Sequence, residues 1–433
     1  MSPTCECAAA LSTVSRKIPI QDMRLTIFFG KLLLLCVPAC LLHSQVRVGA
    51  DVFIEAHLGL VKGKNVGLIT NQTGRLASGD FFLDALLQRS VNVIALFGPE
   101  HGIRGEAAAG ESVRNGRDVE TGIPIYSLYG DTRKPTPDML RNVDVLIYDI
   151  QDVGARFYTY ISTMALAMEA AAQAKISFVV LDRPNPLGGI KVDGPILEDS
   201  LKSFVGMFPI PVVYGMTCGE LARMINGEGW LAGNVKADLT VIRMEGWKRG
   251  MAWEATGLAW IRTSPNIPTS STAKVYPATC FLEATNVSEG RGTPRPFQTI
   301  GAPFIESDKL SATLTDLHLE GVTFNPVSFT PTSSKYKGIE CHGVFIEVTD
   351  EQSFQPVITG LHIIRRIEQM YPSDFILKTK PFDRLMGSAG IRDLVANVES
   401  AQITAIDWHE DLDAFKSAAS RYFLYPLTDD ADG

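Results

Sequence analysis

Residues 144–150 read DVLIYDI, and this stretch decides the fold that the sequence predicts. Its apolar run has the length of one strand, and a continuous run of this kind suits a strand that is buried on both faces of a sheet. Three other stretches are apolar runs of strand length like residues 144–150: residues 65–70 (NVGLIT), 91–97 (VNVIALF) and 177–181 (SFVVL). Residues 81–89 and 158–174, which have the composition of helices, lie between these runs. This alternation predicts an α/β fold built on a mostly parallel sheet with right-handed crossovers.

A second domain is expected after residues 262–271 (RTSPNIPTSS), a stretch rich in Pro, Ser and Thr. Such a composition is typical of a connection between domains. We therefore expect a first domain at residues 46–272 and a smaller α/β domain at residues 273–433. The length of 433 residues agrees with this division, because domains commonly have about 100–200 residues.

The first 45 residues have the features of a leader and signal peptide. A short basic stretch runs from Met23 to Lys31, and residues 32–42 are almost wholly apolar. This is the order of a secretory signal, and the run is shorter than the roughly 20 apolar residues of a spanning helix. We expect cleavage near residues 44–45 and a mature chain, without a membrane span, that is periplasmic or secreted. A lipoprotein anchored through Cys40 is the less favoured alternative.

The composition and the absence of several motifs exclude other classes of protein. Lys and Arg total 40 against 48 Asp and Glu, a net charge of -8, whereas a nucleic-acid-binding protein would show a basic surface. Beyond the leader only Cys218, Cys280 and Cys341 remain, too widely spaced for a disulfide framework or a CxxC metal pair. We find no G-x-S-x-G, Walker A or H-E-x-x-H motif, and therefore expect no nucleotide, cofactor or catalytic metal.

A polar turn follows each of the four strand-like runs. In an open parallel sheet, the carboxyl ends of the strands line the crevice that binds ligands. We therefore expect one cleft to collect Glu100, His101, Asp152 and Asp182, with Asn71 and Asn185 in the turns after the first and fourth runs. The alternative role for such residues is to cap helices or to shape turns. Because Glu100 and His101 are adjacent, their side chains would diverge on a regular element rather than chelate one metal.

Three arginines lie beside acidic residues in glycine-containing stretches: Arg104, Arg156 and Arg291. A guanidinium group matches a carboxylate or phosphate of a ligand, so the three together favour an anionic ligand. For any single arginine, the ordinary alternative is an ion pair with the acid beside it. Aromatic residues such as Tyr158 would either stack on a sugar face or belong to the core.

Several carboxylates without a nucleophile or cofactor motif are typical of glycosidic-bond hydrolysis. In that reaction a protonated carboxyl group gives its proton to the leaving oxygen. An ionised carboxylate either activates water or attacks the anomeric carbon. A non-catalytic protein that binds sugars or peptides in a cleft between two domains would have the same features. The residues alone leave these alternatives open.

Seven stretches carry a family resemblance: residues 66–74 (VGLITNQTG), 97–105 (FGPEHGIRG), 148–160 (YDIQDVGARFYTY), 181–188 (LDRPNPLG), 193–195 (DGP), 210–220 (IPVVYGMTCGE) and 286–294 (NVSEGRGTP). From about residue 48 to 426, the chain resembles the NamZ-type exo-β-N-acetylmuramidases. The resemblance implies a Rossmann-like N-terminal domain, a smaller C-terminal domain and an active site in the cleft between them. It also implies an enzyme that releases N-acetylmuramic acid from the non-reducing ends of peptidoglycan fragments.

The resemblance also implies roles for individual residues. The presumed catalytic glutamate of the family maps onto Glu100, which would be the general acid or the nucleophile, with His101 or a neighbouring acid tuning its pKa. The second catalytic group stays open among Asp152, Asp182, Glu289 and Tyr158. An arginine would hold the lactyl carboxylate of the sugar: Arg104, Arg156 or Arg291. The remaining expected substrate-binding residues are Asn71, Tyr158, Asp182 and Asn185.

Two other functions remain as alternatives to this hydrolase. One is an extracytoplasmic protein that binds muropeptides without catalysis, and the other is an amidase that cleaves the stem peptide. The sequence leaves the oligomeric state open.

Overall fold

The computed structural model describes residues 45–105, 115–397, 403, 406 and 408–427. The expected signal peptide and Cys40 lie outside these residues, so their roles stay predictions. Gln45 is the first described residue, and its side-chain amide donates to the carbonyl groups of Ala77 and Gly257.

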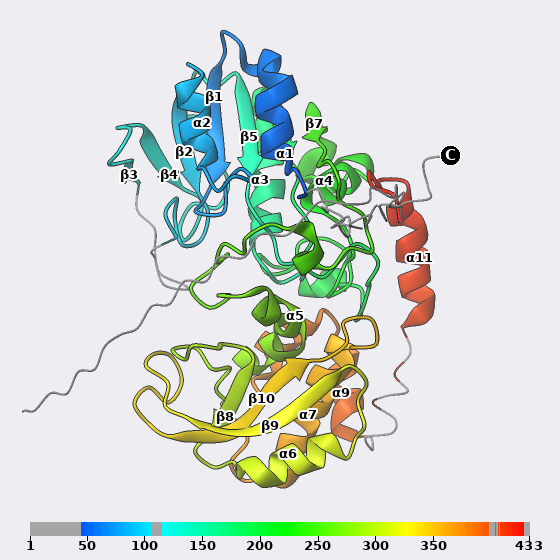
Figure 1. Cartoon of the computed structure of the whole chain (residues 1–433). Helices are drawn as coiled ribbons and strands as arrows, with labels where there is room; N and C mark the ends of the chain where they lie inside the picture. The colour runs from blue at the N-terminus through cyan, green and yellow to red at the C-terminus, as the bar shows by residue number, and fades with distance from the viewer. Residues whose placement is uncertain (1–44, 106–114, 398–402, 404–405, 407, 428–433) are drawn as a thin grey trace, which may run out of the picture. The chain divides into compact units, whose positions relative to one another are not determined.

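Seven strands form the larger sheet, in the order β3-β4-β2-β1-β5-β6-β7 (Figure 1). They are β1 (Asn65–Thr70), β2 (Asn92–Gly98), β3 (Gly116–Arg117), β4 (Pro124–Ser127), β5 (Val145–Asp149), β6 (Ser177–Leu181) and β7 (Leu239–Ile242). Only β3 and β4 pair in antiparallel fashion. The predicted α/β fold with a mostly parallel sheet is therefore confirmed, and the four predicted runs are β1, β2, β5 and β6.

Alternate side chains of β5 enter two different hydrophobic cores. Leu146 and Tyr148 pack into the core that contains the buried residues of α3 (Tyr160–Ala174) and α4 (Cys218–Gly227). Val145 and Ile147 pack instead with α1 (Gly49–Val52) and α2 (Phe82–Gln88). Because successive side chains of a strand point to opposite faces, helices cover both faces of the sheet, as the continuous apolar runs predicted.

The smaller domain has a three-stranded antiparallel sheet in the order β8-β10-β9 (Figure 1). Its strands are β8 (Thr299–Ala302), β9 (Val322–Phe329) and β10 (Cys341–Val348). The helices of the second half are α5 (Ser270–Thr279), α6 (Ser307–Thr315), α7 (Pro356–Met370), α8 (Thr379–Met386), α9 (Ala389–Asn397) and α11 (His409–Ser420). The boundary that we expect between residues 272 and 273 falls inside α5, which begins at Ser270. This boundary stays a prediction.

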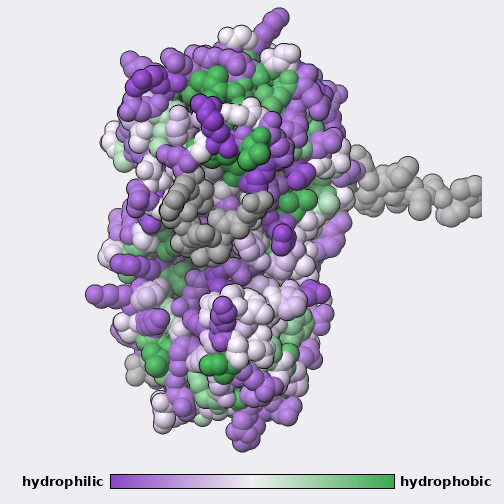
Figure 2. All heavy atoms as spheres, turned by 90° about the vertical axis from the view of Figure 1, so that its left-hand side faces the viewer, coloured by the Kyte–Doolittle hydropathy of each residue, from purple (hydrophilic) through white to green (hydrophobic). Residues whose placement is uncertain are grey.

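Short helical segments of other types complete the fold. They are the π-helix η1 (Phe53–His57) and the 3₁₀ helices η2 (Leu58–Val61), η3 (Asp199–Leu201), η4 (Ala232–Asn234), η5 (Trp253–Thr256) and η6 (Cys280–Ala284). Within the described part of the chain, no helix combines the length and hydrophobicity that crossing a membrane requires. Figure 2 shows one face of the molecule, where hydrophilic residues predominate and hydrophobic residues form separate groups.

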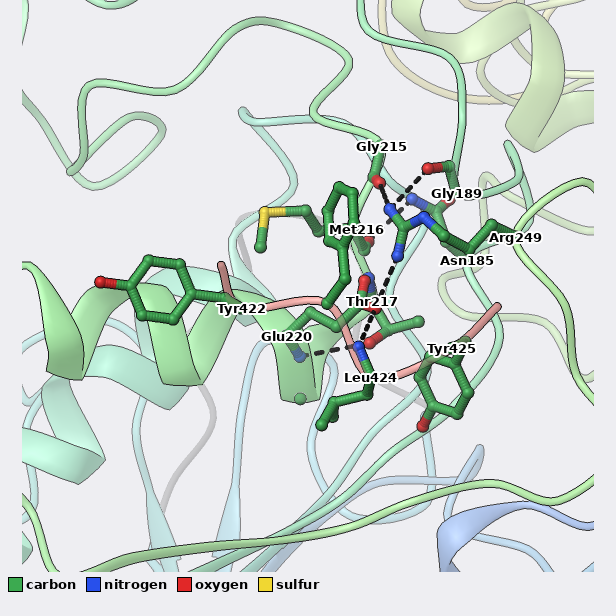
Figure 3. Close-up of polar contacts among 12 residues, drawn as sticks. Asn185, Gly189, Gly215, Met216, Thr217, Glu220, Arg249, Tyr422, Leu424 and Tyr425 are labelled. Atoms are coloured by element: carbon green, nitrogen blue, oxygen red, sulfur yellow. Dashed lines mark hydrogen bonds and ion pairs between the residues drawn. The ribbon is translucent and has the colours of Figure 1, made fainter. Parts of the chain in front are cut away.

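The carboxylate of Glu220, which forms a buried ion pair, also binds the C-terminal segment to the start of α4 (Figure 3). Arg249 donates to Glu220 at 2.5 Å, and the same carboxylate oxygen accepts from the backbone N–H of Leu424 at 2.9 Å. The guanidinium of Arg249 also lies 3.4 Å from the ring centroid of Phe423. Glu220 forms a capping box with Thr217, so this one carboxylate both begins α4 and holds the C-terminal segment.

Candidate active site

A cavity of about 650 Å³ is lined by residues of both domains. Glu100 and His101 reach it from the turn after β2, and Tyr158 reaches it from the segment between β5 and α3. Glu283 and Arg291 reach it from the smaller domain. The cavity therefore lies at the carboxyl ends of β2 and β5, the strands on either side of β1, where a ligand site is expected in a sheet of this kind.

Two hydroxyl groups lie near the carboxylate of Glu100 at the cavity. The Oγ1 of Thr159, the residue before α3, donates to Oε2 of Glu100 at 3.2 Å. The phenol of Tyr129 lies beside Glu100. Burial raises the pKa of Tyr129 to about 12, and the negative charge of Glu100 adds to the rise. Tyr129 is thus a neutral hydrogen-bond donor at physiological pH.

An irregular turn allows two adjacent side chains to line one cavity. His101 has a φ of 72° and Gly102 a φ of 75°, both in the left-handed region that residues other than glycine rarely adopt. The turn closes with a 3.0 Å hydrogen bond from the N–H of Gly102 to the carbonyl of Pro99. Because this backbone is not a regular element, Glu100 and His101 do not diverge as expected for one. Among the described residues, no cluster of three or more His, Cys, Asp or Glu could hold a metal ion.

Arg291 is bound by two carboxylates at the smaller domain's side of the cavity. Its Nη2 lies 2.5 Å from Oε1 of Glu283, and its Nε lies 2.9 Å from Oε1 of Glu289. The Nζ of Lys335 holds the other oxygen of Glu289 at 2.9 Å. Burial acts against the charged form of Arg291, but the two carboxylates outweigh it and raise its pKa. Burial raises the pKa of Glu283, and Arg291 opposes that rise.

Four of the predicted site residues line the cavity: Glu100, His101, Tyr158 and Arg291. Glu289 is not part of the lining, and only 2% of it is exposed behind Arg291. Tyr158 packs edge to face against the rings of Tyr160 and Tyr276, so its ring belongs both to the core and to the cavity wall.

The structure does not bring Asp152 and Asp182 to this cavity. Asp152 accepts from the hydroxyl of Tyr214 and, at 2.7 Å, from the N–H of Gly154. Asp182 accepts from Thr217 Oγ1 at 2.6 Å, from the N–H of Gly219 at 2.8 Å and from the hydroxyl of Tyr425 at 2.6 Å. Burial raises the pKa of each of these two carboxyl groups to about 6. The expected single cleft therefore gathers Glu100 and His101, while the two aspartates bind neighbouring segments of the fold.

The two predicted asparagines also lie outside the cavity lining, and both shape turns. Oδ1 of Asn71 accepts from the N–H of Thr73 at 2.9 Å. Asn185 donates to the carbonyl of Met216 and accepts from the N–H of Leu187, each at 2.9 Å (Figure 3 includes Asn185 and Met216). Turn formation, the alternative role in the sequence analysis, is the one that this geometry supports.

Two of the three predicted anion-binding arginines are used elsewhere. Arg104 pairs with Asp118 at 3.0 Å and Glu120 at 2.9 Å. Arg156, of which 1% is exposed, donates to four carbonyl oxygens at 2.7–3.0 Å: those of Pro195, Ile210, Leu385 and Met386. Burial lowers the pKa of Arg156 to about 9. Arg156 binds segments of both domains together, and within the described residues it forms no ion pair with Asp152.

Several cavity residues were absent from the sequence prediction, among them Tyr129, Thr159 and Glu283. Tyr129 follows β4, whose half-buried sequence PIYS lacks the continuous apolar run that identified the other strands. Thr159 lies inside a motif quoted for the resemblance but carries no charge that would have marked it. Glu283 had a usable signal, because it is a single carboxylate in the otherwise apolar segment CFLEA.

Comparisons with known proteins point to one family over most of the chain. Residues 66–271 match the model of the N-terminal part of the exo-beta-N-acetylmuramidase NamZ, and residues 274–425 match the model of its C-terminal part. The chain is 50% identical over 383 residues to the peptidoglycan beta-N-acetylmuramidase NamZ of Bacillus subtilis (strain 168), covering 88% of this chain and 92% of that protein.

Two crystal structures of DUF1343 family proteins from Bacteroides fragilis NCTC 9343 share the fold. One has a TM-score of 0.81 and 41% identity, over 88% of this chain and 99% of its own. The other has a TM-score of 0.71 and 33% identity, over 89% of this chain and 100% of its own. On the evidence of both family models and of this identity, the chain belongs to the NamZ family of exo-beta-N-acetylmuramidases.

Proposed function

We propose that this chain is an exo-acting glycoside hydrolase that releases N-acetylmuramic acid from the non-reducing ends of peptidoglycan fragments. Family membership and the activity in the name of the 50% identical relative support the substrate class. The observation that carries the proposal is the position of Glu100, a carboxylate that accepts a hydrogen bond from Thr159 in a cavity of about 650 Å³. Cavities of about 300–1,000 Å³ are typical of small-molecule sites.

Glu100 is the general acid in this proposal. Its carboxyl group gives a proton to the glycosidic oxygen as the bond from that oxygen to the anomeric carbon breaks. The hydroxyl of Thr159 orients the carboxyl group, and this restricts the geometry of proton transfer. His101 lines the same cavity, next to Glu100 in the chain.

The walls of the cavity suit a sugar that has an apolar face and a polar rim. Tyr158 and Tyr276, whose ring centroids lie 5.9 Å apart, offer aromatic surface against which a sugar ring would pack. Asn266, Ser333 and Ser334 offer hydrogen-bonding groups for hydroxyl and amide substituents.

Arg133 is our choice for the group that meets the lactyl carboxylate of the sugar. Arg291 is already engaged by two carboxylates, whereas no ion pair joins Arg133 to an acid within the described residues. The guanidinium of Arg133 lies 4.4 Å from the ring centroid of Phe204, next to the cavity residue Val205. Its positive charge also acts on Tyr129, where it lowers the pKa against the larger raising effects. An exposed cation at this margin would attract an anionic sugar.

We further propose that the enzyme acts outside the cytoplasm, because residues 23–45 carry the features of a signal peptide. Its substrate, peptidoglycan, is found there.

The experiment that tests the proposed function is turnover of an aryl β-N-acetylmuraminide by the whole protein. Release of the aryl alcohol together with free N-acetylmuramic acid is the expected result. A rise in the unfolding temperature with muropeptides but without any released sugar would point to a binding protein. Cleavage of a stem peptide would point to an amidase. Either of these two outcomes would overturn the proposal.

A further inference from the structure

The cavity contains a second carboxylate, Glu283, which none of the sequence motifs includes. Glu283 lies in η6, directly after α5, and lines the cavity from the smaller domain. A third of its side-chain surface (34%) is accessible, because the side chain faces the cavity. One oxygen, Oε1, accepts from Arg291, and no hydrogen bond to the other oxygen occurs within the described residues.

Glu283 lines the same cavity as Glu100. Tyr129 lines it too, and the negative charges of both carboxylates contribute to the rise in the pKa of its hydroxyl. A sugar bound in this cavity therefore lies in a space that both carboxylates line.

We propose that Glu283 is the second carboxylate of the reaction, the base that takes a proton from the attacking water. This inference rests on the proposed function. Glu100 gives its proton to the glycosidic oxygen, which keeps the electron pair of the bond that breaks. The oxygen of water forms the new bond to the anomeric carbon, and Glu283 takes the proton that this water releases. Proton exchange with solvent then returns a proton to Glu100 and removes one from Glu283.

The surroundings of Glu283 suit a base. The 2.5 Å ion pair with Arg291 favours the ionised carboxylate. Burial raises the pKa of Glu283, and a higher pKa makes an ionised carboxylate a stronger acceptor of a proton. Arg291 is a positioning residue here, because its Nε is fixed by Glu289 while its Nη2 holds Glu283.

The other acids predicted for this role are less accessible. Both oxygens of Glu289 are engaged, one by Arg291 and the other by Lys335, and the residue is 2% exposed. Asp152 and Asp182 are 5% and 0% exposed and accept hydrogen bonds from neighbouring segments. Of these carboxylates, Glu283 is the one that lines the cavity together with Glu100.

The test compares Glu283→Gln with a matched control in the whole protein. Glu169 is a buried glutamate that also forms a 2.5 Å ion pair, with Lys134, and it lies outside the cavity lining. We expect Glu283→Gln to lower kcat on an aryl β-N-acetylmuraminide by about 100-fold or more, a typical contribution of general base catalysis. We expect Glu169→Gln to keep kcat within about threefold, although both variants lose one ion pair.

Azide separates a chemical role from a structural one. Azide is an anion and attacks the anomeric carbon without giving up a proton, so it does not need a base. With Glu283→Ala, added azide should restore release of the aryl alcohol and give N-acetylmuramyl azide. For a purely structural role of Glu283, azide would restore nothing.

A failure of the Glu283 assignment can be told apart from a failure of the proposed function. Near-wild-type kcat in Glu283→Gln, or a large loss without rescue by azide, would overturn the assignment of Glu283 while the wild-type protein remained active. A wild-type protein that is inactive on the muraminide would overturn the proposed function itself.

Discussion

Arg291 and Glu283 form a 2.5 Å ion pair, and both side chains line the cavity that also contains Glu100. The pair brings a carboxylate of the smaller domain to the cavity that the turn after β2 enters from the larger sheet. It also leaves Arg291 with two carboxylate partners before any ligand binds. Arg291, one of the three arginines expected to bind the ligand, is therefore already paired with the protein's own carboxylates.

Arg133→Ala should weaken binding of the anionic sugar. If Arg133 meets the lactyl carboxylate, its loss removes one charge-assisted hydrogen bond, worth about 1.5–3 kcal/mol, or roughly 10- to 100-fold in affinity. We expect KM for an aryl β-N-acetylmuraminide to rise by that factor while kcat stays within about threefold. Arg141→Ala is the control, because Arg141 is exposed and its acidic partner among the described residues is the nearby Asp138. An unchanged KM in Arg133→Ala would remove Arg133 from the proposal.

Arg156→Met should destabilise the fold. Four carbonyl groups, two from segments of the larger domain and two from the end of α8, would lose their buried donor. Each unsatisfied buried group costs about 1–3 kcal/mol, so we expect the free energy of unfolding to fall by about 3 kcal/mol or more. Urea unfolding measures this change, with Arg141→Met as the control. A loss below about 1 kcal/mol would show that water replaces the guanidinium at these carbonyls.

Asp152→Asn should change how stability depends on pH. Burial raises the pKa of Asp152 from 3.8 to about 6, so the folded state binds the proton more tightly than the unfolded chain. The stabilisation is complete below pH 4 and is lost as the pH rises through about 6. Asparagine cannot ionise, so the variant should gain stability relative to wild type between pH 4 and pH 7, by about 3 kcal/mol at most.

The measurement for Asp152 is chemical unfolding at several pH values. Asp138→Asn, at an exposed position, should run parallel to the wild type over the same range. A difference between Asp152→Asn and wild type that does not vary with pH would contradict the raised pKa. Since Asp152 lies outside the cavity lining, the folded variant should also keep its kcat within a few-fold.

The sequence predicted the central strands well, because strands that are buried on both faces consist of nearly continuous apolar residues. β5 is buried at every position, and its first four residues (VLIY) alternate between two cores, so a run of apolar side chains is required there. The outer strands β3 and β4 do not have this apolar composition. β3 has two exposed residues and β4 has one buried residue out of four, so neither showed a continuous apolar run.

The site was only partly predictable, because a sequence does not show which partner a polar group finds. Glu100 and His101 were found, since a polar turn after a buried strand must lie at the carboxyl edge of the sheet. Asp182 follows a strand in the same way, yet Thr217, Gly219 and Tyr425 bind its carboxylate. Arg156 stands near Asp152 in the sequence but donates to carbonyls as distant as Met386.

The central claim is that Glu100 drives release of N-acetylmuramic acid from a non-reducing end. The most direct measurement is digestion of a defined disaccharide with N-acetylmuramic acid at that end, using wild type and Glu100→Gln, followed by identification of the products. We predict equal amounts of free N-acetylmuramic acid and N-acetylglucosamine from the wild type, and at least about a 100-fold slower release from Glu100→Gln at unchanged stability. An intact disaccharide with the wild type, or undiminished release with Glu100→Gln, would contradict the account.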